Sequence, residues 1–275
     1  MTPEGPEYLI VDAAGQPLEP ALLPFDSLCL GRGLFETMLV INGNLVFADR
    51  HEARLAASCA ELSIASANEV RAFMGAAADF AAAAEHPRAR LRIAAFAAAP
   101  SAAPAAIIAL APCASPPDAV SLAVSDVVRN AGDPLAAHKT VDYLANALVR
   151  QRALDEGSYD GIVIDGDGNV AETATANIFL DLGGGLVTPA LGAILPGIMR
   201  AWVLETAPRL GVAVDECKVP AEALSTCNCA FITNSLIGLV GVSHIAGRPL
   251  RSAAANPSFS RLFEAWHEAL DSLAG

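Results

Sequence analysis

Short strand-like runs alternate with helix-like segments along the whole of this sequence. The clearest signal is a hairpin in which residues 33–41 and 45–47 flank Asn42 and Gly43, because an Asn-Gly pair suits the positive φ angles of a tight turn. One helix is expected from Asp49 onward and a second over residues 70–84. Such alternation predicts a mixed α/β or α+β chain in which helices cover sheets.

A proline-rich break divides these elements into two groups. Residues 112–118 include the pair Pro116-Pro117, so we expect a domain over residues 1–115 and another over residues 120–275, with the linker at about 112–119. A chain of 275 residues that is 53% hydrophobic can form a sizeable core. After the break the expected strands are 120–124, 161–164, 176–182, 212–219 and 230–233, and the expected helices are 141–156, 199–210 and 258–273.

Composition excludes several classes of partner. A formal net charge of −13 argues against nucleic acid and against an anionic membrane surface. The longest uncharged run, residues 93–117, is too often broken by proline to span a membrane, and residues 1–9 contain Glu4 and Glu7 rather than a basic, apolar signal region. The six cysteines lack zinc-type spacing. We therefore expect a cytoplasmic protein with no metal site, in which local arginines hold any anionic ligand.

Lysine is almost absent from the chain: only Lys139 and Lys218 occur. Arginine cannot replace an amine that must lose its proton, form a Schiff base and then act as a base, so a retained lysine is a candidate for that chemistry. Lys139 follows a loop, and Val141, Leu144, Ala145 and Leu148 recur after it at helical spacing. We expect Lys139 at a loop-to-helix junction beside a buried stripe; a solvated lysine is the alternative.

Four further groups suit a carbonyl cofactor that carries a phosphate, such as pyridoxal phosphate. Glu172 is a lone carboxylate in an uncharged run and needs a partner. Residues 197–199 open a helix behind a proline, where free N–H groups attract anions. Residues 233–235 end a strand with three small polar side chains, a candidate second phosphate contact, and Arg54 lies on the polar side of its helix. Taken singly, each group also has an ordinary structural explanation.

In this order and spacing the groups resemble the class IV aminotransferase family, the fold-type IV pyridoxal-phosphate enzymes. The likeness covers roughly residues 25 to 250. The segments that carry it are Gly33-Leu34-Phe35-Glu36-Thr37, Asp49-Arg50-His51-Glu52-Ala53-Arg54-Leu55, His138-Lys139-Thr140 through Tyr143-Leu144, Val170-Ala171-Glu172 with Ala176-Asn177-Ile178-Phe179, Leu195-Pro196-Gly197-Ile198-Met199-Arg200 and Phe231-Ile232-Thr233-Asn234-Ser235-Leu236.

The resemblance implies a two-domain D-amino-acid-aminotransferase-like fold with pyridoxal 5′-phosphate in the interdomain cleft, bound mainly by the second domain. It also implies a homodimer that acts on a small amino substrate. Lys139 would form the Schiff base, Glu172 would pair with the pyridine nitrogen, and Tyr143 would bond the ring hydroxyl. The implied phosphate ligands are Arg54, Asn234, Ser235 and the N–H groups of Ile198 and Met199.

Within the family, residues 35–37, 138–140 and 233–238 resemble most the aminodeoxychorismate lyases. The reaction implied converts 4-amino-4-deoxychorismate to 4-aminobenzoate and pyruvate for folate synthesis, with Thr37 relaying a proton or positioning the leaving group. Leu39 stands where related enzymes carry Arg or Lys, which leaves the binding of a substrate carboxylate open.

Two other differences from the family pattern are Arg32, in place of an acidic residue, and Gly241, in place of a proline. A D-amino-acid, branched-chain or amine transaminase therefore remains an alternative. A non-catalytic or dinucleotide-binding protein is a remote one, because Gly31-Arg32-Gly33 lacks the third glycine of that motif and precedes a strand.

Overall fold

The computed structural model describes residues 7–99 and 102–274 and divides the chain into two compact units. The first unit comprises Met1–Ser115, His138–Asp142 and Asp271–Gly275, and the second comprises Pro116–Ala137 and Tyr143–Leu270. The break after Ser115 falls inside the expected linker. Contacts assign the Lys139 segment to the first unit, whereas the expected division had it in the second. The sequence also predicted that residues 1–9 are not a signal region; of these, residues 1–6 lie outside the described residues.

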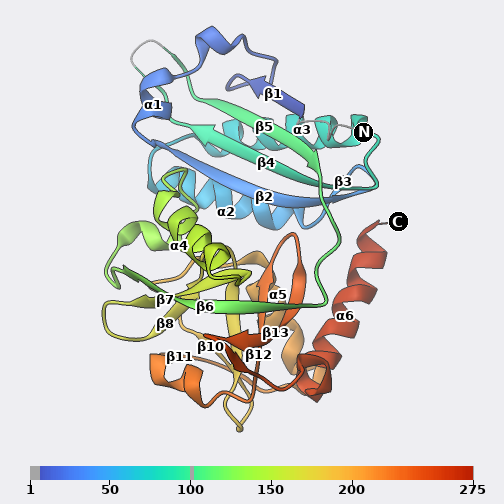
Figure 1. Cartoon of the computed structure of the whole chain (residues 1–275). Helices are drawn as coiled ribbons and strands as arrows, with labels where there is room; N and C mark the ends of the chain where they lie inside the picture. Colours follow the sequence, from blue (N-terminus) through green and yellow to red (C-terminus); the bar gives the residue numbers. More distant parts are fainter. Residues whose placement is uncertain (1–6, 100–101, 275) are drawn as a thin grey trace. The chain divides into compact units, whose positions relative to one another are not determined.

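The first unit is built on a five-stranded antiparallel sheet in the order β1-β5-β4-β2-β3 (Figure 1). Helices α2 and α3 pack against one face of it, and their apolar residues share a core with Leu34 and Met38 of β2. Because side chains alternate along a strand, Phe35 and Thr37 project from the opposite face. The bounds are β1 Glu7–Val11, α1 Phe25–Cys29, β2 Gly33–Ile41, β3 Asn44–Leu45, α2 Ala48–Glu61, α3 Ala67–Ala83, β4 Arg88–Phe96 and β5 Ala105–Pro112.

The predicted hairpin is confirmed at β2 and β3. Asn42 and Gly43 have φ angles of 48° and 81°, as a two-residue turn of this kind requires. The second strand is shorter than predicted and ends at Leu45. Phe47, expected at the end of the strand, instead adopts a left-handed conformation with φ 58° and begins the turn into α2.

The second unit is built on a mixed nine-stranded sheet in the order β11-β10-β9-β12-β13-β6-β7-β8, with β14 paired to β13. Helix α4 packs on β6 and β7, α5 packs on β12, and Phe259 of α6 contacts Phe231 of β12. The strands are β6 Ala119–Arg129, β7 Asp160–Asp165, β8 Val170–Thr173, β9 Asn177–Asp181, β10 Leu186–Pro189, β11 Val214–Cys217, β12 Cys229–Asn234, β13 Gly238–Ile245 and β14 Arg248–Pro249. The helices are α4 Leu144–Asp155, α5 Ile198–Thr206 and α6 Pro257–Ala274.

Helix α4 differs from the prediction in its start and in its buried face. It begins at Leu144 rather than near residue 141, and Leu144 and Leu148 of the expected buried stripe are 78% and 42% exposed. The buried residues are Val149 and Ala153. They lie against Gly161 of β7, where an added Cβ would meet Val149 Cγ1 at 2.7 Å. The missing side chain at this glycine lets the helix approach the strand on the Val149 face.

Four strands of the second unit, β8, β10, β13 and β14, were not expected from the sequence. The mixed combination of sheets and covering helices agrees with the predicted fold class. No helix among residues 7–99 and 102–274 is both long and apolar enough to cross a membrane.

Candidate functional site

Lys139 lies on a short extension of the first unit's sheet. The backbone N–H of Phe35 donates to the Lys139 carbonyl at 2.8 Å, and that of Val141 donates to Gly33 at 3.0 Å. Thr140 thereby forms an antiparallel bridge with Leu34. The backbone of β2, rather than a helix start, thus fixes the lysine. Its Nζ atom lies 4.3 Å from the centre of the Phe35 ring, a cation–π distance.

Arg54 of α2 forms a two-pronged contact with a buried carboxylate. Its Nε and Nη2 atoms donate to Glu36 of β2 at 2.8 and 2.6 Å, and Glu36 also contacts Nδ1 of His51 at 2.7 Å. Glu36 and His51 are 1% and 0% exposed. Burial raises the pKa of Glu36, but Arg54 and His51 outweigh this and lower the pKa to about 2. The guanidinium is therefore held in one orientation rather than solvated.

Thr37 lies on the same sheet face as Phe35, and two arginines of β4 accompany it there. Arg92 pairs directly with Thr37 across the ladder, and its guanidinium carbon lies 5.1 Å from the centre of the Phe35 ring. Arg90 pairs with Leu39. Arg90 and Arg92 therefore place positive charge on the strand next to Leu39, the position at which related enzymes carry Arg or Lys. Sequence reasoning missed both arginines, although their alternation with apolar residues in 90–94 was visible.

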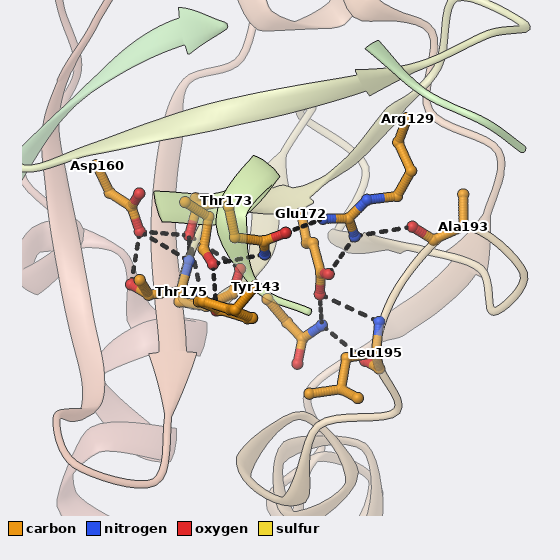
Figure 2. A network of polar contacts seen from close by, with 12 residues as sticks. Arg129, Tyr143, Asp160, Glu172, Thr173, Thr175, Ala193 and Leu195 are labelled. Atoms are coloured by element: carbon orange, nitrogen blue, oxygen red, sulfur yellow. Dashed lines mark hydrogen bonds and ion pairs between the residues drawn. The ribbon is translucent and has the colours of Figure 1, made fainter. Parts of the chain in front are cut away.

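Glu172 is the centre of a polar network in the second unit (Figure 2). It lies within β8, not between strands as expected, and is 7% exposed. Its carboxylate pairs with Arg129 and accepts hydrogen bonds from Asn177 Nδ2 at 3.0 Å and from the Leu195 N–H at 3.2 Å. The partner that a lone buried carboxylate requires is therefore present. Arg129 and Asn177 were not singled out in the sequence.

Tyr143 belongs to the same network. Its hydroxyl donates to the Ala174 carbonyl at 2.6 Å, and Asn146 Nδ2 donates to the same oxygen at 2.9 Å. Arg129 in turn donates to Asn146 Oδ1 at 3.4 Å, which links Tyr143 to Glu172. Burial, with a further contribution from Glu172, raises the pKa of Tyr143 to about 12. The phenol is therefore a neutral hydrogen-bond donor at ordinary pH.

The start of α5 is joined to Glu172 through Asn177. Gly197 precedes the helix, and a Cβ there would meet Asn177 Oδ1 at 1.9 Å, so the amide side chain lies directly against this glycine. The first N–H groups of the nine-residue helix, including those of Ile198 and Met199, have no acceptor within a regular helix. The structure thus brings Glu172 and the expected anion-binding helix terminus together.

Two residues near this terminus come from β12. Thr233 lies opposite Asn177 in the ladder, and in the described part of the chain its buried Oγ1 atom has no hydrogen-bond partner. Asn234 Oδ1 accepts from the N–H groups of Leu236 and Ile237 at 2.9 and 3.1 Å. Asn234 therefore shapes the turn that carries Ser235.

Each unit, taken by itself, offers groups that suit a planar ring bearing a carbonyl and a phosphate. The first unit offers a fixed amine and a fixed guanidinium. The second offers a carboxylate in an ion pair, a neutral phenol, and a helix terminus near a buried hydroxyl that has no partner among the described residues. Within residues 7–99 and 102–274, no group of three or more His, Cys, Asp or Glu side chains is placed to hold a metal ion.

Comparison with known proteins identifies the family. The chain is 38% identical over 107 residues to branched-chain-amino-acid aminotransferase 1, mitochondrial, of Arabidopsis thaliana, covering 38% of this chain and 28% of that protein. It is 30% identical over 118 residues to aminodeoxychorismate lyase of Bacillus subtilis, covering 42% of this chain and 40% of that protein. The matched stretches therefore span less than half of either relative.

Among solved structures, the branched-chain amino acid aminotransferase of Escherichia coli has the same fold. The TM-score is 0.83 at 22% identity, over 96% of this chain and 94% of that chain. The model of the family described as amino-transferase class IV matches residues 33–245. The chain therefore belongs to the class IV aminotransferase family, the fold-type IV enzymes that use pyridoxal 5′-phosphate.

Proposed function

We propose that this protein is a pyridoxal-phosphate-dependent lyase that converts 4-amino-4-deoxychorismate to 4-aminobenzoate and pyruvate. The observation that carries the proposal is the placement of Lys139, one of two lysines in the chain, on the edge of β2 with its amine at the Phe35 ring. The Bacillus subtilis lyase among its relatives supports the choice of reaction.

In this proposal the protein holds the cofactor at both ends. Arg54, oriented by Glu36, and the N–H groups of Ile198 and Met199 bind the phosphate, together with Ser235 on the turn shaped by Asn234. Glu172, fixed by Arg129 and Asn177, keeps the proton on the ring nitrogen, and Tyr143 hydrogen-bonds the ring hydroxyl. When bound, pyridoxal phosphate supplies a carbonyl for the substrate amine and a ring that accepts negative charge.

The remaining steps fall to side chains of the first unit. With the cofactor bound, the Lys139 amine would act as the base that removes the proton from the ring carbon adjacent to the substrate amine. Thr37 positions the enolpyruvyl ether oxygen as that group leaves, or relays a proton to it. Arg92, directly opposite Thr37, provides the cation for a substrate carboxylate in place of the basic residue missing at Leu39.

A class IV transaminase is the second candidate, and the branched-chain aminotransferases among the relatives favour it. A transaminase needs the same lysine, the same carboxylate at the ring nitrogen and the same phosphate contacts. The two reactions would differ in where Lys139 delivers the proton that it removes from the substrate.

The two lysines allow a matched test. The purified chain is incubated with pyridoxal phosphate and reduced with borohydride, and the modified lysine is located by mass spectrometry. We expect the adduct on Lys139, its loss in Lys139→Ala, and its retention in Lys218→Ala, because Lys218 is an exposed residue whose ion pair is with Asp167. An adduct that persists in Lys139→Ala would refute the assignment.

Product analysis then separates the two reactions. The loaded enzyme is supplied with aminodeoxychorismate, and 4-aminobenzoate and pyruvate are followed; a parallel panel contains D- and L-amino acids with 2-oxoglutarate. Release of 4-aminobenzoate supports the lyase. Amino transfer alone would replace it with the transaminase while leaving the role of Lys139 intact.

The proposal also includes a cytoplasmic homodimer. Large apolar side chains on the second unit, including Leu144 of α4 and Val128 of β6, are 78% and 61% exposed in the single chain. Surfaces of this kind suit association with a second copy. Light scattering coupled to gel filtration measures the mass, and a monomer at micromolar concentration would contradict the homodimer.

A further inference from the structure

Helix α2 carries two pairs of polar residues that follow one another at helical spacing. The first pair, His51 and Arg54, contacts the buried carboxylate of Glu36. The second pair is Ser58 and Glu61, near the end of the helix. The second pair has no role in the chemistry described so far, yet it contacts the residue next to Lys139.

That residue is His138. Its Nδ1 atom lies 2.9 Å from Ser58 Oγ, and its Nε2 atom lies 3.6 Å from Glu61 Oε1. The imidazole side chain is 7% exposed, whereas the Glu61 side chain is 70% exposed. Both ring nitrogens therefore face the same helix, and the shorter contact is the buried one with Ser58. A ring held by both polar edges cannot rotate without losing them.

The lysine segment is joined to β2 by a short backbone pairing. Two backbone hydrogen bonds, at Lys139 and Val141, together form the single bridge between Thr140 and Leu34. A strand of this length is marginal alone, because each net hydrogen bond contributes only about 0.5–1.5 kcal/mol. A reactive amine must nevertheless be held close to its productive position. His138 supplies a side-chain anchor one residue before the lysine.

We infer that His138 is a positioning residue for Lys139: through Ser58 it fixes the lysine segment to α2, the same helix that carries Arg54. The inference rests on the proposed function, since it concerns the amine assigned to cofactor binding. Helix α2 then has two roles. Its first pair, His51 and Arg54, carries the guanidinium that Glu36 orients, and its second pair, Ser58 and Glu61, positions the backbone of the lysine segment.

Four variants test the inference. His138→Asn keeps a polar atom where Nδ1 stands, whereas His138→Gln places its amide near the position of Nε2. His138→Ala removes both contacts, and Ser58→Ala removes only the hydroxyl. In the full-length chain without cofactor, amide hydrogen exchange is measured at Phe35 and Val141, whose N–H groups make the bonds to the lysine segment. Ile108 of β5 serves as an internal control.

We expect exchange at Phe35 and Val141 to be about five- to tenfold faster in His138→Ala, His138→Gln and Ser58→Ala, as loss of one hydrogen bond predicts. His138→Asn should restore the wild-type rate, and Ile108 should not change. With pyridoxal phosphate added, the rate at which the borohydride-trapped adduct forms on Lys139 should fall by a similar factor in the same three variants. The double variant with Ala at both positions should be no worse than either single one.

Unchanged exchange and unchanged adduct formation in both alanine variants would overturn the inference. A His138→Asn variant that behaves as His138→Ala would also overturn it, because the contact with Ser58 would then not be the cause. If His138→Ala fails to fold, Ser58→Ala decides. Wild-type protein that forms no adduct on Lys139 would refute the proposed function separately, since the exchange rates need no cofactor.

Discussion

Glu36 is a buried carboxylate whose oxygen atoms contact the guanidinium of Arg54 and the imidazole of His51. Replacing it by Gln leaves Arg54 without its anion, and we expect the free energy of unfolding to fall by about 3 kcal/mol at neutral pH. Chemical denaturation measures the loss. Glu52→Gln on the same helix is the matched control: Glu52 pairs with the exposed Arg71 at 3.7 Å, so its loss should cost less than about 1 kcal/mol. Equal losses of unfolding free energy in the two variants would show that the buried contacts of Glu36 stabilise the fold no more than an exposed ion pair does.

The same carboxylate predicts a pH dependence. Its pKa is lowered from 4.5 to about 2 in the folded protein, so the folded state binds the proton less readily than the unfolded chain does. Its stabilising contribution is therefore complete above about pH 4.5 and is lost as the pH falls towards 2. The difference in unfolding free energy between wild type and Glu36→Gln should shrink over this range. A difference that stays constant down to pH 2.5 would show that Glu36 is not ionised in the fold.

At the scale of elements, the start of α5 depends on the absence of a side chain at Gly197. Its φ angle of −70° suits any residue, so the constraint is space: Asn177 Oδ1 occupies the position of a Cβ. Asn177 is tied to Glu172 and to the Leu195 carbonyl and cannot move without breaking these bonds. Gly197→Ala should destabilise the protein by about 1–3 kcal/mol and weaken cofactor binding.

Gly75, inside α3, is the control for this substitution. Nothing lies within 4 Å of its would-be Cβ, and alanine is the better helix former. Gly75→Ala should raise the unfolding free energy by about 0.5–1 kcal/mol, as measured by thermal or chemical denaturation. Stabilisation by both alanine substitutions would mean that Asn177 does not press on the start of α5.

Elements with a local signal were predictable, and those defined by tertiary contacts were not. The turn at Asn42 and Gly43 is encoded by two residues and was found. β8 was missed because its four residues are all buried and show no alternation. In α4 the apolar period correctly indicated a helix, but not that Val149 rather than Leu144 faces the sheet, since only the neighbouring Gly161 decides this.

The residues of the candidate site also fall into those with a local sequence signal and those defined by tertiary contacts. Lys139 and Glu172 could be proposed from the sequence because each is chemically unusual in its surroundings. Glu36 carries the same signal as Glu172, a lone acid in an apolar run, and could have been found by the same reasoning. Arg129 and Asn177 could not, because their importance comes from contacts with residues 43 and 5 positions away that only the fold creates.

For the whole molecule, the formal net charge of −13 opposes the approach of an anionic cofactor. The charges of Arg54 and Arg129 are balanced by Glu36 and Glu172, so little long-range attraction remains. We expect the association rate of pyridoxal phosphate to rise about two- to threefold between roughly 10 and 150 mM salt, as screening reduces the repulsion. Stopped-flow absorbance measures it. Pyridoxal, which lacks the phosphate, should show little change, and a falling rate for pyridoxal phosphate would reveal a locally attractive field.

The pairing of Thr140 with Leu34 also has a consequence for the order of folding. The two partners lie more than a hundred positions apart, and the chain completes β4, β5 and β6 between them. Local contacts form early, whereas a distant pairing must first meet the entropy of closing a long loop. A growing chain can therefore build most of its first sheet before the lysine has been synthesised. We therefore expect the first sheet to form before the Lys139 segment joins it.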